Sequence, residues 1–253
     1  HLLTASRTAM RNRWKATAGS VVLVVCLAAC SSAPAASNAT NTTNPVSPPG
    51  STSTASTAAP GPPSDPTPDV AAAGGAGPWK LTFNSDFTGS SSNLRSWSTC
   101  YDWACTNSGN NELEWYTAQN ATLTDGVLHL TARPQSDHGK PYTSGLIQSN
   151  GHYVFRYGFV EMRAQVPAGA GLWSAFWLLP ADHSWPPEID VTEIYGHLPT
   201  VASMTVHYGN NQVMQQNFSG PDYSAGFHTF GIDWEPTSIS WYIDGILHYQ
   251  VSL

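Results

Sequence analysis

Apolar and polar residues alternate in a series of short runs that continues through residues 78–253. Alternation with a period of two is typical of β-strands that bury one face. Clear examples are "GVLHLTAR", "HYVFRYGFVEMRAQV" and "SISWYIDGILHYQV", the last with a tight-turn dipeptide at Asp244-Gly245. Gly, Pro and Asn interrupt the runs often, and no long stretch has a helical period. We therefore predict an all-β domain, an antiparallel β-sandwich, over 78–253.

Residues 1–30 have the pattern of an export signal. Met10 precedes the basic stretch "RNRWK", which is followed by the apolar run "ATAGSVVLVVCLAAC" ending at Cys30. The run is short for a membrane span and typical of a secretory signal. "LAAC" resembles the bacterial lipobox, in which cleavage precedes the cysteine and lipid is attached to it. We expect a lipid anchor at Cys30 on the outer face of the plasma membrane, with ordinary cleavage near Ala36 as the alternative.

Between the signal and the domain, residues 31–77 consist mainly of Ser, Thr, Ala, Pro, Gly and Asn. Such a composition cannot bury enough apolar surface to offset the conformational entropy lost on folding. Proline also keeps a linker extended. We predict a disordered linker that holds the domain away from its anchor.

Four cysteines are present, and Cys26 and Cys30 belong to the signal. Cys100 and Cys105 lie in "STCYDWACTNSG", within the part of the chain expected to be exported. Export makes a disulfide between these two the expected outcome. A metal site is the alternative, although the two cysteines have no nearby second Cys or His pair.

The stretch "WPPEIDVTEIYG" places three carboxylates on a predicted strand. Glu188 and Asp190 share one face, because residues two apart on a strand point the same way. Strict alternation would turn Glu193 toward the core. A one-residue bulge at Val191-Thr192 would return Glu193 to the acidic face. The sequence therefore predicts a bulged strand with three carboxylates on one side.

Paired carboxyl groups have a recognised chemistry. A retaining glycosidase uses two of them about 5–5.5 Å apart, one as nucleophile and one as acid/base with a raised pKa. A solvated strand face is the alternative, and acid–apolar alternation by itself favours it. Nearby tryptophans favour a sugar site, because indole faces can pack against sugar rings. Trp173 and Trp185 are candidate sugar contacts, whereas Trp177 is equally suited to the core.

Six segments resemble glycoside hydrolase family 16, the laminarinase and β-glucanase family, in the same order. They are "NNELEWYT", "TSGLIQSNGHYVFRYGFVEMRAQVPAGAGLWSAFWLLP", "EIDVTE", "MTVHYG", "FHTFGIDWEP" and "WYIDG". The resemblance covers about residues 80–249, and Glu-x-Asp-x-x-Glu, the family's bulged active-site strand, is its most specific part. It implies a concanavalin-like β-jelly roll with a concave sugar-binding cleft.

The resemblance also implies roles for individual residues. Glu188 matches the nucleophile, Asp190 its helper and Glu193 the acid/base. His207 in "TVHYG" matches a position near the catalytic centre, with a core or surface histidine as the alternative. Further matching positions are Asn111 with Glu114 or Trp115 on the glycone side, Trp173 on the cleft wall, and Trp234, for which a core role is the alternative.

No cofactor is expected apart from a structural calcium ion, which some family members bind through oxygen ligands. Asp86 in "NSDF" lies near one ligand position. The formal net charge of −7, with no basic patch, excludes nucleic acid as a partner. The expected partners are a polysaccharide substrate and, through the lipid anchor, a membrane, with the protein acting as a monomer.

We expect a secreted, endo-acting, retaining hydrolase of β-1,3 or mixed β-1,3/1,4 glucan. A non-catalytic carbohydrate-binding module, a transglycosylase on the same scaffold and a structural surface lipoprotein are the alternatives. Gly145-Leu146 stands where many laminarinases have Arg after Thr-Ser, which leaves the linkage preference open. The family continues for several strands beyond "HYQVSL". We therefore expect the domain to lack its C-terminal strands, which would impair folding or activity.

Overall fold

The computed structural model describes residues 2–6, 21–29, 79–88 and 91–253. The predicted lipidation site Cys30 and the predicted linker 31–77 lie outside them. Described helices are all short 3-10 turns, namely η1 (Ser91–Ser96), η2 (Ser108–Asn110) and η3 (Ala118–Asn120). Within this part of the chain, no helix has the length and apolar character needed to span a membrane.

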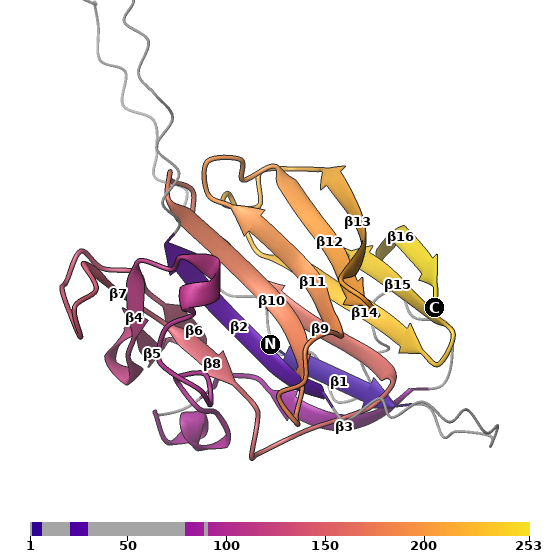
Figure 1. Ribbon diagram of the computed structural model, residues 1–253, viewed down its shortest axis with the longest axis horizontal. Coiled ribbons are helices and arrows are strands. Elements are labelled where there is room, and N and C mark those ends of the chain that lie inside the picture. Colours follow the sequence, from indigo (N-terminus) through magenta and orange to yellow (C-terminus); the bar gives the residue numbers. More distant parts are fainter. Residues whose placement is uncertain (1, 7–20, 30–78, 89–90) are drawn as a thin grey trace, which may run out of the picture. The chain divides into compact units, whose positions relative to one another are not determined.

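Two six-stranded antiparallel sheets carry the fold (Figure 1). The first sheet, in spatial order, contains β16 (Ile246–Ser252), β15 (Ser238–Ile243), β14 (His228–Glu235), β9 (Gly158–Ala164), β1 (Leu2–Ser6) and β3 (Lys80–Ser85). The second contains β13 (Gln212–Ser219), β12 (Val201–Tyr208), β11 (Glu188–Tyr195), β10 (Leu172–Pro180), β2 (Val21–Ala29) and β8 (Leu146–Gln148). The predicted all-β class is confirmed.

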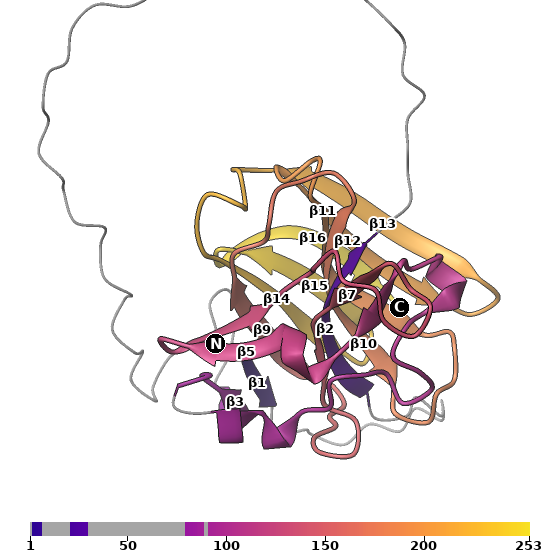
Figure 2. The ribbon, with the colours of Figure 1, turned by 90° about the vertical axis from the view of Figure 1, so that its left-hand side faces the viewer.

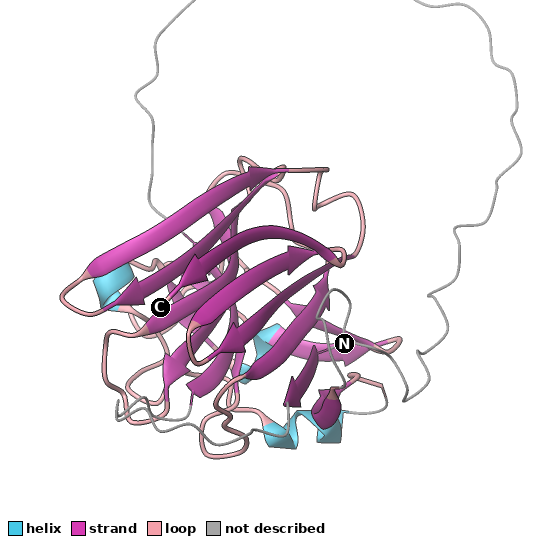
Figure 3. Cartoon of the chain, turned by 90° about the vertical axis from the view of Figure 1, so that its right-hand side faces the viewer, coloured by secondary structure: helices cyan, strands magenta, loops and turns pink. Residues whose placement is uncertain are grey.

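Two small sheets complete the fold. The parallel one joins β4 (Glu114–Tyr116) to β7 (Tyr142–Ser144). An antiparallel one joins β5 (Ala121–Thr124) to β6 (Val127–Leu130). Figure 2 shows β5 in front of the two large sheets. Figure 3 shows how strongly strands predominate over the short helices.

The core lies between the two large sheets, as a β-sandwich requires. Residues from both sheets form one cluster of buried side chains. Its members include Val160, Phe230, Ile232 and Trp241 from the first sheet and Phe176, Ile189, Met204 and Val206 from the second. The outer face of the second sheet is thereby left available for a site.

Strands β1 and β2 come from the segment predicted to be an export signal. β1 lies between β3 and β9, and β2 lies between β8 and β10. A central strand is apolar on both faces, so the run "VVLVVCLAA" suits a buried strand as well as a signal. The structure gives the segment a place in the sheets, while cleavage and lipidation stay predictions.

The hairpin joining β15 to β16 turns at the predicted dipeptide. Asp244 has φ 50° and Gly245 has φ 75°, so both central residues are left-handed. A type I′ turn requires this conformation, which Asp-Gly adopts readily. The hairpin prediction is confirmed.

Candidate active site

Strand β11 is bulged where the sequence predicts. Against β12, Asp190 pairs with Thr205 and Glu193 pairs with Ser203, so three steps on β11 match two on β12. The register with β10 shifts at the same place. Ile194 is buried in the core on the opposite face. The extra residue therefore brings all three acids to the outer face of the second sheet.

On that face the acids line a cavity of about 580 Å³. This volume lies in the range of about 300–1,000 Å³ typical of ligand sites. Alternate residues of β10 form part of its wall, namely Trp173, Ala175, Trp177 and Leu179. Trp177 is only 7% exposed and also belongs to a small buried cluster, so it serves both packing and the wall.

Two aromatic side chains hold the first acid in place. Trp185 Nε1 donates a hydrogen bond of 2.8 Å to Glu188 Oε2. His207 lies opposite Glu188 in the register of β11 and β12. Its Nε2 is 3.8 Å from Glu188 Oε1 and 3.4 Å from Asp190 Oδ2. Trp185 and His207 therefore lie beside the acids, as their sequence positions suggested.

Burial makes the carboxyl groups retain protons. Burial first, and then the charge of Asp190, raise the pKa of Glu188 from 4.5 to about 8. Burial and the charge of Glu188 raise the pKa of Glu193 from 4.5 to about 7. Burial and the charge of Glu193 also raise the pKa of Asp190 well above its usual range. A proton held near neutral pH is what a general acid requires, while the Trp185 indole favours an ionised Glu188.

Some of these groups also have the spacing of a metal site. Oxygen and nitrogen atoms of Glu188, Asp190 and His207 lie within 4.8 Å of one another. Contacts between the imidazole and the carboxyl groups account for this spacing without a metal. Among the described residues, the predicted calcium ligand Asp86 belongs to no such group, and its Oδ1 accepts from the Thr88 backbone N–H at 3.0 Å. Calcium binding stays a prediction.

The segment before β4 reaches the cavity through residues other than those predicted. Asn107, Asn110 and Glu112 line it. Asn111 instead ends η2 in a left-handed conformation, and Glu114 is fully buried, where its carboxylate accepts from the Tyr116 hydroxyl at 2.9 Å. Glu112 accepts from the Asn107 backbone N–H at 2.6 Å, and burial raises its pKa to about 7. The left-handed turn at Asn111 changes which side chains face the cavity.

Two predicted tryptophans lie away from the cavity wall. Trp115 is half-buried and stacks on His138, with ring centroids 4.3 Å apart. Trp234 is 6% exposed and packs edge-on against Tyr157 in the core. The core alternative holds for Trp234. Both tryptophans belong to the packing of the domain rather than to the cavity wall.

The predicted disulfide joins Cys100 and Cys105, whose Cα atoms are 4.5 Å apart. It closes a loop that brings Trp103 to the cavity wall. Sequence reasoning missed this tryptophan, because a single indole in a loop has no periodic pattern. Its position between two paired cysteines was the available signal.

Comparisons with known proteins agree with this geometry. The family model described as "Glycosyl hydrolases family 16" matches residues 109–252. An endo-1,3-1,4-beta-glycanase of Rhizobium meliloti is 38% identical over 169 residues, which cover 58% of this chain and 36% of that protein. The chain thus spans about a third of that relative's length.

A glucan endo-1,3-beta-glucosidase of Cryptopygus antarcticus is 34% identical, and the match covers 70% of this chain and 71% of that protein. The laminarinase catalytic domain of Thermotoga maritima superposes with a TM-score of 0.63 at 31% identity, covering 69% of this chain and 77% of that one. By sequence and by fold, the chain belongs to glycosyl hydrolase family 16.

Proposed function

We propose that the protein is an endo-acting, retaining glycoside hydrolase that cleaves β-1,3 or mixed β-1,3/1,4 glucan. The observation that carries the proposal is the bulged strand β11, which presents Glu188, Asp190 and Glu193 together in one cavity. Relatives named as endo-1,3-1,4-beta-glycanase, glucan endo-1,3-beta-glucosidase and laminarinase support this substrate class.

In the proposed reaction, Glu188 attacks the anomeric carbon while Glu193 protonates the departing glycosidic oxygen. This step breaks the glycosidic bond and forms a covalent glycosyl-enzyme. Glu193, now ionised, takes a proton from water, and the water releases the sugar from Glu188. Each step inverts the configuration at the anomeric carbon, so the two steps together retain it. Glu193 gives up one proton in the first step and recovers one from water in the second.

Neighbouring side chains prepare the two acids for these roles. The Trp185 indole donates to Glu188 and lowers its pKa, whereas burial and the charge of Asp190 raise that pKa to about 8, so the neighbouring acids share protons near neutral pH. The proposed reaction starts from the state in which Glu188 is ionised and Glu193 carries the proton. Asp190 lies between the acids in sequence and is almost fully buried, and His207 lies near both Glu188 and Asp190. We propose that Asp190 and His207 influence which acid holds the proton. Each cycle then starts with Glu188 ionised and Glu193 protonated.

The direct test is reducing-sugar release by the 253-residue chain. The substrates are laminarin, mixed-linkage β-glucan, agarose and κ-carrageenan. We expect release from one of the two glucans, no detectable release by Glu188→Gln, and a loss of roughly 10²–10⁴-fold for Glu193→Gln. Asp125→Asn is the matched control, because Asp125 lies in an exposed turn and Asn tolerates its left-handed backbone.

Two other outcomes would replace the proposal. Binding to a glucan without release by the folded wild-type chain would indicate a carbohydrate-binding module. Longer products formed in the presence of excess acceptor, in place of hydrolysis products, would indicate a transglycosylase. Release that persists in Glu188→Gln at the wild-type rate would remove Glu188 from the mechanism.

A further inference from the structure

The disulfide-closed loop adds a second exposed indole to the cavity wall. Trp103 is 50% exposed and Trp185 is 53% exposed, and both line the cavity. Trp185 is accounted for by its hydrogen bond to Glu188. Leaving large apolar side chains exposed gives up the stability that their burial would contribute. Apolar surface gathered in a groove is therefore typical of a ligand contact.

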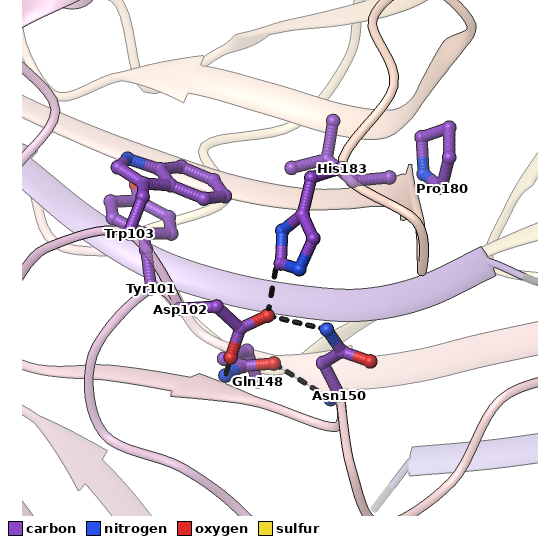
Figure 4. Close-up of a pocket in the computed structure, with 8 residues that line it drawn as sticks. Tyr101, Asp102, Trp103, Gln148, Asn150, Pro180 and His183 are labelled. Carbon is purple, nitrogen blue, oxygen red and sulfur yellow. Dashed lines mark hydrogen bonds and ion pairs between the residues drawn. The ribbon is translucent and has the colours of Figure 1, made fainter.

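Trp103 lies where the cavity meets a small notch that none of the three acids lines. The notch measures about 10 Å³ and is shown in Figure 4. Tyr101, Trp103, Leu179, Pro180 and His183 line both the notch and the cavity, whereas none of the three acids lines the notch. The notch has room for about one water molecule, so a sugar ring would lie over the indole and not inside the notch.

Stacking on a buried tyrosine holds the Trp103 ring in position. Its ring stacks on Tyr101 with centroids 4.6 Å apart and planes 5° apart. Tyr101 is itself buried and packs edge-on against Tyr116 and Trp177. The indole is therefore backed by the core of the domain on one face.

The loop is also held through the side chain of Asp102, the residue before Trp103, and through its disulfide. Gln148 Nε2 donates to Asp102 Oδ1 at 3.0 Å, and Asn150 Nδ2 donates to Asp102 Oδ2 (Figure 4). The Cys100–Cys105 disulfide closes the loop at its base. A ring held this firmly loses little conformational entropy when a ligand packs on it.

We propose that Trp103 forms a stacking platform for a glucose unit of the bound glucan, at a subsite removed from the catalytic acids. The inference rests on the proposed function and specifies a residue that sets chain-length preference. A β-linked glucose ring is uncharged and presents C–H groups on its faces, which suit the flat indole. Exposed polar atoms of His183, whose Nδ1 is 3.9 Å from Asp102 Oδ2, lie beside the platform for contact with sugar hydroxyls.

Steady-state kinetics on β-1,3-linked glucose oligosaccharides of increasing length test the proposal with the full chain. For Trp103→Ala, KM for the longest oligosaccharides rises roughly five- to tenfold while kcat stays unchanged. The shortest cleaved oligosaccharide shows the wild-type KM. Trp103→Phe, which keeps an aromatic face, recovers most of the affinity.

Phe227→Ala is the matched control, because Phe227 is 41% exposed and does not line the cavity. It should leave KM unchanged at every length. An equal loss at all lengths for Trp103→Ala would show a merely structural role and overturn the proposal. An unchanged KM at every length would overturn it as well.

Calorimetric titration of the long oligosaccharides separates this inference from the proposed reaction. In a Glu188→Gln background, adding Trp103→Ala should weaken binding by the same factor as it raises KM. If the wild-type chain binds glucan without cleaving it, the proposed hydrolysis is contradicted. The loss of binding in Trp103→Ala then still tests the stacking role. If the wild-type chain binds none of the oligosaccharides, both proposals fail.

Discussion

At the scale of single residues, the packing of the β11 acids favours acid catalysis but destabilises the folded protein. Glu188, Asp190 and Glu193 are packed together in a cavity where burial and mutual repulsion raise their pKa values. The proton that this arrangement retains is useful for acid catalysis. The same arrangement destabilises the native state once the acids ionise, as is common in active sites.

This conflict predicts how stability depends on pH. The pKa of Glu193 is about 7 in the folded protein against 4.5 in the unfolded chain, so the native state binds more protons between these values. Stability is therefore greatest at the acidic end and falls as pH rises from about 4.5 to 8. Thermal melts across this range should show that Glu193→Gln flattens the fall and gains about 1–3 kcal/mol near pH 8.

Asp125→Asn should keep the wild-type decline in melting temperature, because Asp125 is exposed. A Glu193→Gln variant that loses stability at pH 8, or that follows the wild-type pH dependence, would contradict the assignment of the shifted proton.

Another single residue fixes the bulge itself. Trp241 on β15 is fully buried, and its Nε1 donates a 2.8 Å hydrogen bond to the Asp190 carbonyl oxygen. Trp241→Phe would leave that buried carbonyl unpaired, at a cost of about 1–3 kcal/mol. Because the bulge aims the acids, we also expect kcat on glucan to fall.

The control is Trp97→Phe, which removes another buried indole whose Nε1 donates to Ser85 Oγ at 3.2 Å, away from the cavity. Denaturant melts and kcat measured on both variants decide the point. Trp97→Phe should lower stability and leave kcat unchanged. Equal effects of the two variants on kcat would show that Trp241 acts only through general stability.

At the scale of secondary-structure elements, a feature could be predicted from the sequence where only one local conformation satisfied the residue pattern. The bulge in β11 could be predicted, because only an extra residue returns Glu193 to the face of Glu188. The Asp244-Gly245 turn could be predicted from its backbone conformation. Glu112 could not be distinguished from Glu114, because residues two apart have the same phase and only the packing around them buries Glu114 and leaves Glu112 on the cavity wall.

The segment Val21–Ala29 could not be resolved because two requirements favour the same composition. An export signal and a central strand are both continuous apolar runs. β2 pairs with β8 and β10, and cleavage before Cys30 would remove it from between them. Two neighbouring strands would then have an unpaired edge, which sheets normally avoid.

On the sequence pattern of residues 1–30 we propose that the chain is exported and anchored through Cys30, and mass spectrometry of the mature protein tests this. The expected product begins at a lipid-modified Cys30, and Cys30→Ser should abolish membrane attachment. A mature chain that retains Val21–Ala29 would contradict the inference. It would instead make β2 a permanent part of the second sheet.

At the scale of the whole molecule, the β-sandwich brings side chains from three strands of the second sheet together in one cavity. One face of the second sheet packs into the core, which fixes β10, β11 and β12. The opposite face then presents acids from β11, indoles from β10 and His207 from β12 to one cavity. Periodicity predicted the all-β fold, whereas the catalytic role proposed for β11 came from its clustered acids and from the resemblance to the family. Trp103 and Glu112 came from loops, whose course depends on contacts distant in sequence.

The anomeric configuration of the first product distinguishes a retaining from an inverting reaction. Proton NMR during hydrolysis of laminarin, or of mixed-linkage glucan if that is the substrate, follows the anomeric signals of the new reducing end. We expect the β-anomer to appear first and the α-anomer to grow in later by mutarotation, because Glu188 is proposed to form a covalent intermediate. Initial appearance of the α-anomer would show inversion and would contradict the roles assigned to Glu188 and Glu193.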